Sequence, residues 1–444
     1  MLVYVVNCHG QPLMPCSPRS ARLLLRDKKA TVLHKTPFTL QLCVGVSGYT
    51  QEVVGAVDTG STVIGSAAIA NGQVVYQAEI EVRNDITGKM EQRRTYRRTR
   101  RSRNTRYRQA RFDNRCASKR KGRLAPSIKS KIESHFREVR FMESILPITR
   151  WNFELASFDI HKITNPGVAG VGYQNGALKD FYNVKHYVYS RDSYKCQSGQ
   201  KGPHSKKLHA HHKVFRSNGG PDTPANLTTL CETCHCALHA GAFTLPKGKR
   251  SKTKHATEMG VIKSQISKSA IPHEVTFGYE TKYKREQILK WPKTHANDAV
   301  AACLVDGELV KPMADILIKV HMSAGDYKQT SGAHSQKTVP TGKLFGLRKG
   351  DKVQTPAGVG FVKGKRSSGY FSISDIDGAV LHASVKASIC QRVAARTTTQ
   401  LECIPLVALT ARRKESEVQK QIAKQAKAAK ASRSLASPQP HSQA

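Results

Sequence analysis

The chain has 444 residues, of which 72 are Lys or Arg and 32 are Asp or Glu, so its formal net charge is +40 at pH 7. The length allows several domains with sizeable cores, and so large a charge predicts a polyanionic partner such as nucleic acid. The sequence has neither an apolar run of about 18 residues nor a secretory leader, so we exclude a secreted or membrane-spanning protein and expect a cytoplasmic one.

The first 85 residues predict short strands with one helix. Residues 1–48 are short apolar runs separated by prolines, with a helix expected over 20–26. A buried strand then ends at Asp58, and two further strands flank Asn71-Gly72, which is a type I′ hairpin signal. A strand, an acid and a hairpin in this order are typical of the start of a ribonuclease-H-like sheet.

Residues 93–123 are dominated by arginine, and Asp113 is their only acidic residue. The stretch contains no proline, so a helix is allowed, although its like charges would repel one another unless anions lay along it. A disordered basic segment or localisation signal is the alternative, and we disfavour it because the stretch lies between two folded regions. The candidate nucleic-acid-binding residues are Arg93, Arg94, Arg97, Arg98, Arg100, Arg101, Arg103, Arg106, Arg108, Arg111 and Arg115.

The remainder of the chain alternates predicted elements with polar segments. In order these are a helix over 127–145, a strand over 151–157, a His/Cys-rich segment at 189–241, a strand near 274–280, a helix over 295–305, a small β-barrel at 341–405 and a basic tail from about 411 that is expected to be disordered.

The sharpest pattern is HHKVFRSNGGPDTPANLTTLCETCHCALH at residues 211–239. One imidazole can deprotonate water while others hold a divalent ion that polarises a phosphate. The spacing of His235 and His239 places both on one face of a helix, as two ligands of one ion require. Asn226 lies between the histidine pairs and can orient the base. This chemistry fits phosphodiester hydrolysis.

The cysteines favour metal chemistry over disulfides, because their number is odd, eleven, and the tight group lies among histidines. Cys231 and Cys234 form half of a zinc knuckle, and Cys196 could supply a third thiolate. Gly199 stands where a fourth cysteine is expected, so Cys236 or His204 would have to substitute. A purely structural Cys/His zinc module is the alternative, but it would not need the adjacent histidines and the asparagine.

A second set of acids lies at predicted element ends. Asp58 ends a strand, Glu154 lies in the strand over 151–157, and His295 and Asp298 open a helix. Carboxylates placed in this way can hold two divalent ions about 3.5–4 Å apart for in-line attack on a phosphate.

Residues 211–239 resemble the HNH (ββα-metal) nuclease motif, and the flanks of Asp58, Glu154 and His295 with Asp298 resemble the three split RuvC motifs in chain order. The HNH segment falls between the second and third of these, and Pro12-Leu13-Met14-Pro15 resembles the PLMP signature of the IscB family. The chain is therefore similar to IscB proteins, the transposon-encoded relatives of type II CRISPR nucleases.

This resemblance implies a multidomain α/β protein with a RuvC sheet split in sequence, an inserted HNH domain, an Arg-rich bridge helix and a small C-terminal β-rich domain. The implied boundaries are PLMP 1–48, RuvC-I 49–85, bridge helix 86–125, RuvC-II 126–185, HNH 186–245, RuvC-III 246–320, a domain that reads a target-adjacent motif 321–410, and a tail 411–444.

The resemblance also implies residue roles. His212 would be the general base, Asn226 the positioning residue, and His211, His235 and His239 the metal ligands of the HNH site. The other nuclease site would use His295 with the metal ligands Asp58, Glu154 and Asp298. Mg²⁺ or Mn²⁺ is implied at both sites, with Zn²⁺ possible at Cys196, Cys231 and Cys234.

The implied activity is RNA-guided cleavage of double-stranded DNA by a monomeric ribonucleoprotein. A structured ωRNA would supply specificity, HNH would cut the guide-paired strand and RuvC the displaced strand. The alternatives are an autonomous HNH endonuclease of the homing type without guide RNA, a catalytically weak RNA-binding protein, and a ribosomal-type or chaperone RNA-binding protein. The first would need a DNA-reading module of its own, and the three RuvC-like segments argue against it; the others leave the candidate catalytic residues unexplained.

Overall fold

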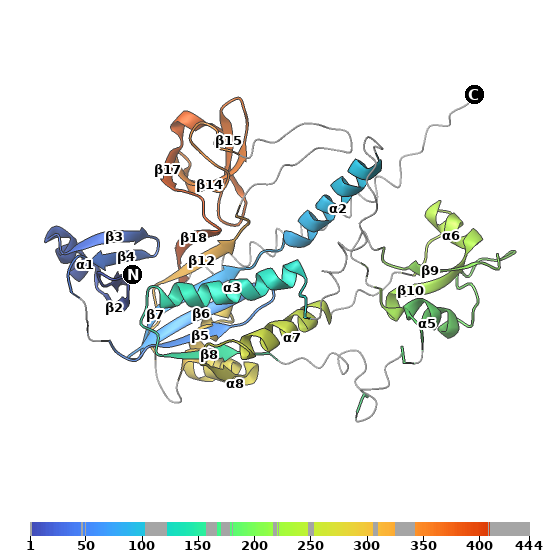
Figure 1. The fold of residues 1–444 in the computed structure, drawn as a ribbon, viewed down its shortest axis with the longest axis horizontal. Helices are drawn as coiled ribbons and strands as arrows, with labels where there is room; N and C mark the ends of the chain where they lie inside the picture. Colours follow the sequence, from blue (N-terminus) through green and yellow to red (C-terminus); the bar gives the residue numbers. More distant parts are fainter. Residues whose placement is uncertain are drawn as a thin grey trace. The chain divides into compact units, whose positions relative to one another are not determined.

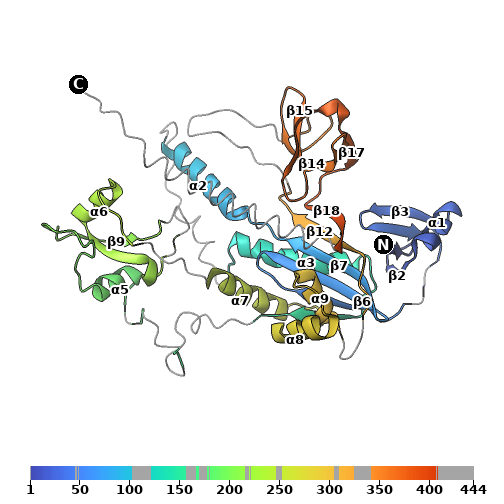
Figure 2. The same cartoon turned by 180° about the vertical axis from the view of Figure 1, so that it is seen from behind.

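The computed structural model describes residues 2–45, 48, 50–102, 122–156, 167–169, 178–179, 181–215, 220, 222–246, 253–304, 310–324, 342–406 and 408. The chain forms two compact units (Figures 1 and 2). The first combines Met1–Ala156 with Ile262–Ala444, and the second, Ser157–Val261, is inserted between these two stretches. Within the described ranges, none of the helices has the length and apolar character needed to span a bilayer.

The N-terminal part of the first unit is a four-stranded sheet with one helix. Its elements are β1 (Val3–Val6), β2 (Pro12–Cys16), α1 (Pro18–Arg26), β3 (Ala30–Lys35) and β4 (Phe38–Leu42), in the strand order β2-β1-β4-β3. The Ser17 side chain accepts the Ser20 N–H at 3.1 Å and so caps α1. The helix expected over 20–26 is confirmed and begins two residues earlier.

A seven-stranded mixed sheet forms the centre of the first unit, in the order β11-β8-β5-β6-β7-β12-β18. Its strands are β5 (Val54–Asp58), β6 (Val63–Ala70), β7 (Gln73–Glu81), β8 (Arg150–Glu154), β11 (Glu274–Thr276), β12 (Asp315–His321) and β18 (Thr399–Pro405). The strands β5, β6 and β7 form an antiparallel meander, whereas β8 runs parallel to β5 and β11 parallel to β8.

The predicted hairpin between β6 and β7 is confirmed. Asn71 and Gly72 have φ values of 47° and 63°, the two positive angles that a type I′ turn requires. This turn sets the register that pairs Ala70 with Gln73.

Helices cover both faces of the central sheet. One face packs on α3 (Pro126–Glu143) and the other on α9 (His295–Cys303), so α3 is nearer the viewer in Figure 1 and α9 in Figure 2. Neighbouring side chains of β6 illustrate the alternation: the Ser66 hydroxyl donates to Glu138 of α3, and Ala67 lies in one core cluster with Cys303 of α9. The helices expected over 127–145 and 295–305 are therefore confirmed.

A buried ion pair joins α3 to β12. Lys319 Nζ lies 2.9 and 2.6 Å from the two carboxylate oxygens of Glu138, and both residues are at most 2% exposed. The hydroxyls of Ser66 and Tyr76 also donate to this carboxylate, at 2.8 and 2.6 Å. Although burial alone raises the pKa of Glu138, the charge and hydrogen bonds of Lys319 lower it below the usual value. Burial lowers the pKa of Lys319, and its contacts with Glu138 oppose that effect.

The arginine-rich stretch begins as a helix. The helix α2 (Ile86–Ser102) contains the first six of the candidate arginines, and the remaining five lie outside the described residues. The helix predicted from the absence of proline is present up to residue 102.

The segment predicted as one strand over 274–280 is only partly extended. The strand β11 covers three residues, and the chain then turns into α8 (Gly278–Tyr283) and a π-helical turn, η5 (Lys284–Leu289). The Phe277 N–H donates to the Glu280 carboxylate at 3.1 Å, a helix-start contact that overrides the apolar pattern. The helix α7 (Thr253–Ser267) precedes β11.

The C-terminal region forms a five-stranded antiparallel sheet in the order β16-β15-β14-β13-β17. Its elements are β13 (Lys352–Thr355), β14 (Gly358–Lys365), β15 (Tyr370–Ser374), β16 (Val380–Lys386), η6 (Ala387–Ile389) and β17 (Gln391–Ala394). The last strand expected in this region, β18, instead pairs with β12 of the central sheet, where Ile404 packs beside Ile316. The prediction of one small β-barrel over 341–405 was therefore wrong for 399–405.

The second unit contains a short hairpin between two helices. Its elements are α5 (Val184–Arg191), β9 (Leu208–His212), η4 (Pro224–Asn226), β10 (Leu227–Cys231) and α6 (Glu232–His239). The two strands pair antiparallel, with Leu227 opposite His212 and Cys231 opposite Leu208. Because β10 ends opposite the start of β9 and leads directly into α6, the helix begins beside the first residue of β9.

Candidate functional site

Two carboxylates meet at one edge of the central sheet. Asp58 is the last residue of β5 and Glu154 the last of β8, and the parallel register pairs them directly. The Thr59 hydroxyl donates to the Glu154 backbone carbonyl at 2.6 Å and ties the two strand ends together. The sequence placed Glu154 inside a longer strand, whereas the structure ends the strand at this residue.

The helix α9 brings His295 to the same edge. Its start is capped by the Thr294 side chain, which accepts the Asn297 N–H at 3.0 Å. His295 Nδ1 then lies 2.6 Å from Asp58 Oδ2. Gly65 of β6 permits this approach, because a Cβ there would overlap the His295 carbonyl oxygen.

The fourth predicted residue, Asp298, is paired with arginine. Arg285 of η5 is almost fully buried, and its guanidinium contacts the carboxylates of both Asp298 and Glu286. Among the described residues, neither Asp298 nor the pair of Asp58 and Glu154 belongs to a set whose ligand atoms all lie within 4.8 Å of one another. The charge of Asp298 nevertheless contributes to raising the pKa values of Asp58 and Glu154, so all four predicted residues lie near one edge, with Asp298 in contact with Arg285. The role of Asp298 as a metal ligand stays a prediction.

The electrostatics of this edge favour a bound cation. Burial, and then the charge of Asp58, raise the pKa of Glu154 to about 7. Burial also raises the pKa of Asp58, although the hydrogen bond of His295 opposes it. Glu154 Oε2 is buried and has no hydrogen-bond partner within the described part of the chain. A divalent cation would satisfy this oxygen and relieve the repulsion, so the residues fit such an ion.

Three histidines of the second unit form a group with metal-ligand geometry. His211 comes from β9, and His235 and His239 come from one face of α6, with ligand nitrogens within 4.8 Å of one another. Burial, and then the neighbouring histidines, lower the pKa of His211 to about 4. The pKa of His235 is lowered in the same way. Both rings are thus neutral at pH 7, as metal ligands must be.

The residue next to this group, His212, has its own partner. His212 Nε2 lies 2.6 Å from Asp222 Oδ1. Asn226 holds the chain just beyond: its Oδ1 accepts the Val214 N–H at 2.9 Å, and its Nδ2 donates to the Val214 carbonyl at 3.1 Å. Asn226 thus fixes the backbone that carries His212, while Asp222 orients the ring.

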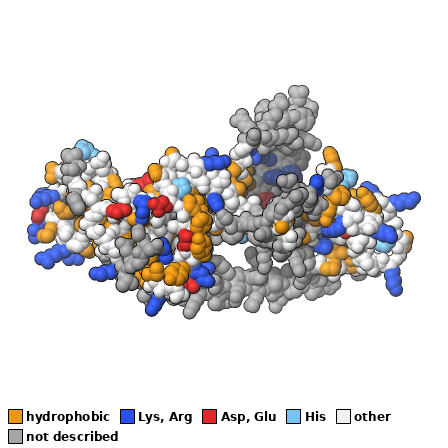
Figure 3. All heavy atoms as spheres, turned by 90° about the horizontal axis from the view of Figure 1, so that it is seen from below, with side chains coloured by type: hydrophobic (Ala, Val, Ile, Leu, Met, Phe, Trp, Pro, Cys, Tyr) orange, Lys and Arg blue, Asp and Glu red, His pale blue; other side chains and the backbone are white. Residues whose placement is uncertain are grey.

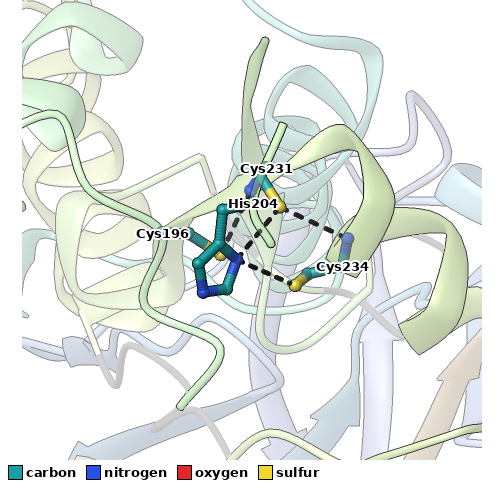
Figure 4. A group of neighbouring side chains, drawn as sticks. All are labelled: Cys196, His204, Cys231 and Cys234. Atoms are coloured by element: carbon teal, nitrogen blue, oxygen red, sulfur yellow. Dashed lines mark hydrogen bonds between the residues drawn. The ribbon is translucent and has the colours of Figure 1, made fainter. Parts of the chain in front are cut away.

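A second group with metal-ligand geometry contains Cys196, His204, Cys231 and Cys234 (Figure 4). His204 Nδ1 lies 3.5 Å from both the Cys231 and Cys234 sulfurs. A tetrahedral Zn²⁺ with Zn–S of about 2.3 Å and Zn–N of about 2.0 Å separates such atoms by about 3.6 Å. The donor set fits zinc, with His204 in the role of the missing fourth cysteine.

The candidate arginines are only partly described. Arg93, Arg94, Arg97 and Arg98 lie on α2, and Arg100 and Arg101 belong to its last turn, although their side chains lie outside the described residues. Positions 103, 106, 108, 111 and 115 fall in the undescribed stretch. The arginine contacts expected from the sequence stay predictions.

Asp222 and Arg285 were not found by sequence reasoning. Each is one charged residue among several in its segment, and only the folded chain places it against His212 or Asp298. The segment GGPDTPAN does offer a weak signal for Asp222, since it is the one acid between the paired histidines and Asn226.

Comparison with known families is consistent with these sites. Residues 3–176 match the RRXRR protein family, and within them the chain reads Arg97-Arg98-Thr99-Arg100-Arg101. Residues 196–241 match the HNH endonuclease family. No curated protein matches the chain.

These matches and the histidine-bearing hairpin define the chain as a nuclease with an HNH endonuclease domain. An RRXRR region followed by an HNH domain fits an IscB-type protein, so the resemblance found in the sequence is confirmed. The HNH domain also carries the two Cys/His groups that can bind metal ions.

Proposed function

We propose that the chain is an RNA-guided DNA endonuclease that binds a structured ωRNA and a complementary double-stranded DNA target as a monomeric ribonucleoprotein. The HNH site cuts the guide-paired strand, and the carboxylate site at the end of β5 and β8 cuts the displaced strand. The observation that carries the proposal is the presence of two separate sets of nuclease-type side chains, one in each unit.

The topology of the central sheet supports a RuvC assignment for the carboxylate site. Across the sheet, β5, β6, β7, β8 and β11 lie in the order β7-β6-β5-β8-β11, which is 3-2-1-4-5 when they are numbered along the chain. An antiparallel meander of the first three is followed by two parallel strands. This arrangement fits a ribonuclease-H-like sheet, with Asp58 on the first strand and Glu154 on the fourth. The insertion of the second unit after β8 fits the split expected of RuvC.

At the HNH site, His212 takes the proton from the attacking water while Asp222 and Asn226 keep its ring in place. His211, His235 and His239 would hold a divalent ion, which polarises the phosphate and stabilises the leaving oxygen. The neutral state of His211 leaves its ring nitrogen available for that ion.

At the carboxylate site, Asp58 and Glu154 would hold divalent metal, and His295 is oriented by its contact with Asp58. A bound metal supplies the charge that aligns a phosphate with an attacking water. His295 Nδ1 faces Asp58, which holds its ring at the edge where the substrate phosphate would lie.

The charge of the chain supports an RNA partner. A net charge of +40 on 444 residues exceeds what one DNA duplex site needs, and Lys and Arg side chains are spread over the face in Figure 3 while acidic ones are confined to a few places. A large RNA would provide phosphates for the arginines of α2. Sequence reading by base pairing also accounts for specificity without a DNA-reading helix.

Purification of the protein with its native locus, followed by sequencing of bound RNA, tests guidance. We expect one discrete structured RNA with a variable segment at one end. With that RNA and a strand-labelled target, His212→Ala should abolish the cut of the guide-paired strand alone, and Asp58→Ala that of the other strand alone. If no specific RNA is recovered and DNA is still nicked, the chain is an autonomous HNH endonuclease. If either change stops both cuts, the two-site assignment is wrong.

A further inference from the structure

A pair of exposed aromatic side chains lies beside Glu154. Phe277 and Tyr279 flank the start of α8, and their rings are parallel, with an interplanar angle of 8° and centroids 5.9 Å apart. Phe277 is 43% exposed and Tyr279 71% exposed. Because the two rings are parallel as well as exposed, they offer flat π-faces to a ligand.

The pair is held in place by one carboxylate. Glu280 accepts the Phe277 backbone N–H at 3.1 Å and the Tyr279 hydroxyl at 3.1 Å. The Glu280 carboxylate therefore fixes the backbone of Phe277 and the hydroxyl end of the Tyr279 ring. This preorganisation reduces the entropy lost when a ligand binds the ring faces.

The pair is also tied to the carboxylate site. Gly278 separates Phe277 from Tyr279 in the sequence. It lies so close to Glu154 that a Cβ there would be 3.0 Å from Glu154 Oε1. Thr281, from the same turn, lowers the pKa of Glu154 and so opposes the effect of burial. The rings thus border the carboxylate that we assign to metal binding.

We propose that Phe277 and Tyr279 form a stacking surface for the bases of the single DNA strand that enters the carboxylate site. This inference rests on the proposed nuclease function of that site. Every base has an apolar π-face, so stacking holds a strand without reading its sequence, as a guided enzyme requires. The exposed Lys282 and Lys290 on the same segment suit the phosphates between the bases.

A protein partner fits this surface less well. An apolar partner that covered the rings would further remove Glu154, at the edge of the sheet, from water and cations, although its Oε2 already has no hydrogen-bond partner within the described residues. A DNA strand brings its own phosphates and counterions to that edge. The segment carries Glu280 and Glu286 as well as Lys282 and Lys290, so the preference for a nucleic acid over a second copy of the chain rests on the aromatic faces beside the proposed nuclease site.

The test is site-resolved photocrosslinking with the full chain. The probe is a thymidine oligodeoxynucleotide carrying 5-iodouracil, mixed with the protein and Ca²⁺, and the crosslinked peptides are identified by mass spectrometry. We expect a crosslink to Tyr279 or Phe277 that is lost in Tyr279→Ala and kept in Tyr279→Phe, which retains the ring. Tyr283→Ala is the matched control, because Tyr283 is 63% exposed on the same helix but outside the stacked pair.

In the cleavage assay, Tyr279→Ala should raise the substrate concentration needed for half-maximal cutting of the displaced strand by about tenfold, and Tyr283→Ala should leave it unchanged. Crosslinks that map only elsewhere, crosslinks to an oligoribonucleotide but not to DNA, or a change of oligomeric state in Tyr279→Ala would each overturn the stacking surface. A crosslink at Tyr279 with no strand cleavage by any metal would retain the surface and refute the nuclease assignment of the carboxylate site. Intact cleavage of the displaced strand without a crosslink at Tyr279 or Phe277 would refute the stacking surface and retain the nuclease assignment of the carboxylate site.

Discussion

Asp222 lies 2.6 Å from the ring of the candidate base His212 and is itself 59% exposed in its side chain, so it acts on that ring and adds little to the fold. We expect Asp222→Ala to slow the cut of the guide-paired strand by about 10- to 100-fold, a part of the 10²–10⁴ that a positioned base supplies. Asp222→Asn should retain more activity, since it can still accept a hydrogen bond. Strand-resolved single-turnover rates measure this, and the cut of the displaced strand is the internal control. Equal slowing of both strands would contradict the assignment.

His204 stands in for a cysteine in the four-residue group of the HNH domain. We expect the purified chain to hold one zinc ion at this group, His204→Cys to keep it as a four-thiolate site, and His204→Ala to lose it with a lower melting temperature of the second unit. Metal analysis by mass spectrometry and thermal unfolding measure the two effects. Retention of zinc in His204→Ala would show that His204 is not a ligand, and loss of zinc in His204→Cys would contradict the four-thiolate replacement.

For single residues, the sequence predicted which side chains belong to the candidate sites better than it predicted which side chains they contact. The spacing of His235 and His239 was enough to place both on one helical face, because helix periodicity is local. The pairing of Asp298 with Arg285 depends on where η5 packs, which no local pattern encodes. His204 was named only as one of two substitutes, and the fold selects it over Cys236.

Among the elements, those with a strong local signal were predicted well. Asn71-Gly72 dictates its hairpin, and the apolar face of 295–305 dictates α9. The strand over 274–280 was wrong beyond residue 276 because a side-chain contact from Glu280 starts a helix. The strand β18 was placed in the wrong sheet, since alternation shows that a segment is extended but not which strand it pairs with.

Two buried histidines between α3 and β12 make the first unit sensitive to acid. Burial lowers the pKa values of His135 and His321 to about 4, whereas an unfolded histidine titrates near 6.5. Between these values the unfolded chain binds protons that the folded chain does not. The contribution of the two histidines to the free energy of unfolding is therefore fully present above about pH 6.5. It falls as the pH drops, by about 1.4 kcal/mol per pH unit for each histidine.

Urea unfolding at about pH 7 and about pH 5 measures this effect. We expect His135→Gln to lose about 2 kcal/mol less than the wild type on acidification, because one of the two titrating rings is gone. His186→Gln, on α5 of the second unit, is a control that should leave the unfolding of the first unit unchanged. An identical loss in His135→Gln and the wild type would contradict the assignment.

Among the described residues, the two sites that we assign to strand cleavage have different donors. Three imidazoles suit first-row transition metals, whereas the carboxylates of Asp58 and Glu154 suit Mg²⁺. We expect Mn²⁺ to support the guide-paired cut at a concentration at least about tenfold lower than Mg²⁺ does, with a smaller difference for the displaced strand. Strand-resolved cleavage across metal titrations tests this, with His212→Ala and Asp58→Ala isolating each cut. The same Mg²⁺ requirement at both strands would refute it.

The path of the chain through the central sheet also sets the order in which the carboxylate site can form during synthesis. The strands β5 to β8 pair among themselves and bring Asp58 beside Glu154. His295 follows only after the inserted unit has been made, and β12 and β18 later still. Because domains fold as the ribosome releases them, N-terminal part first, the nascent protein has two carboxylates in place and no histidine against them until α9 emerges. On the proposed assignment, the growing chain therefore lacks a complete carboxylate site until the HNH unit has been made.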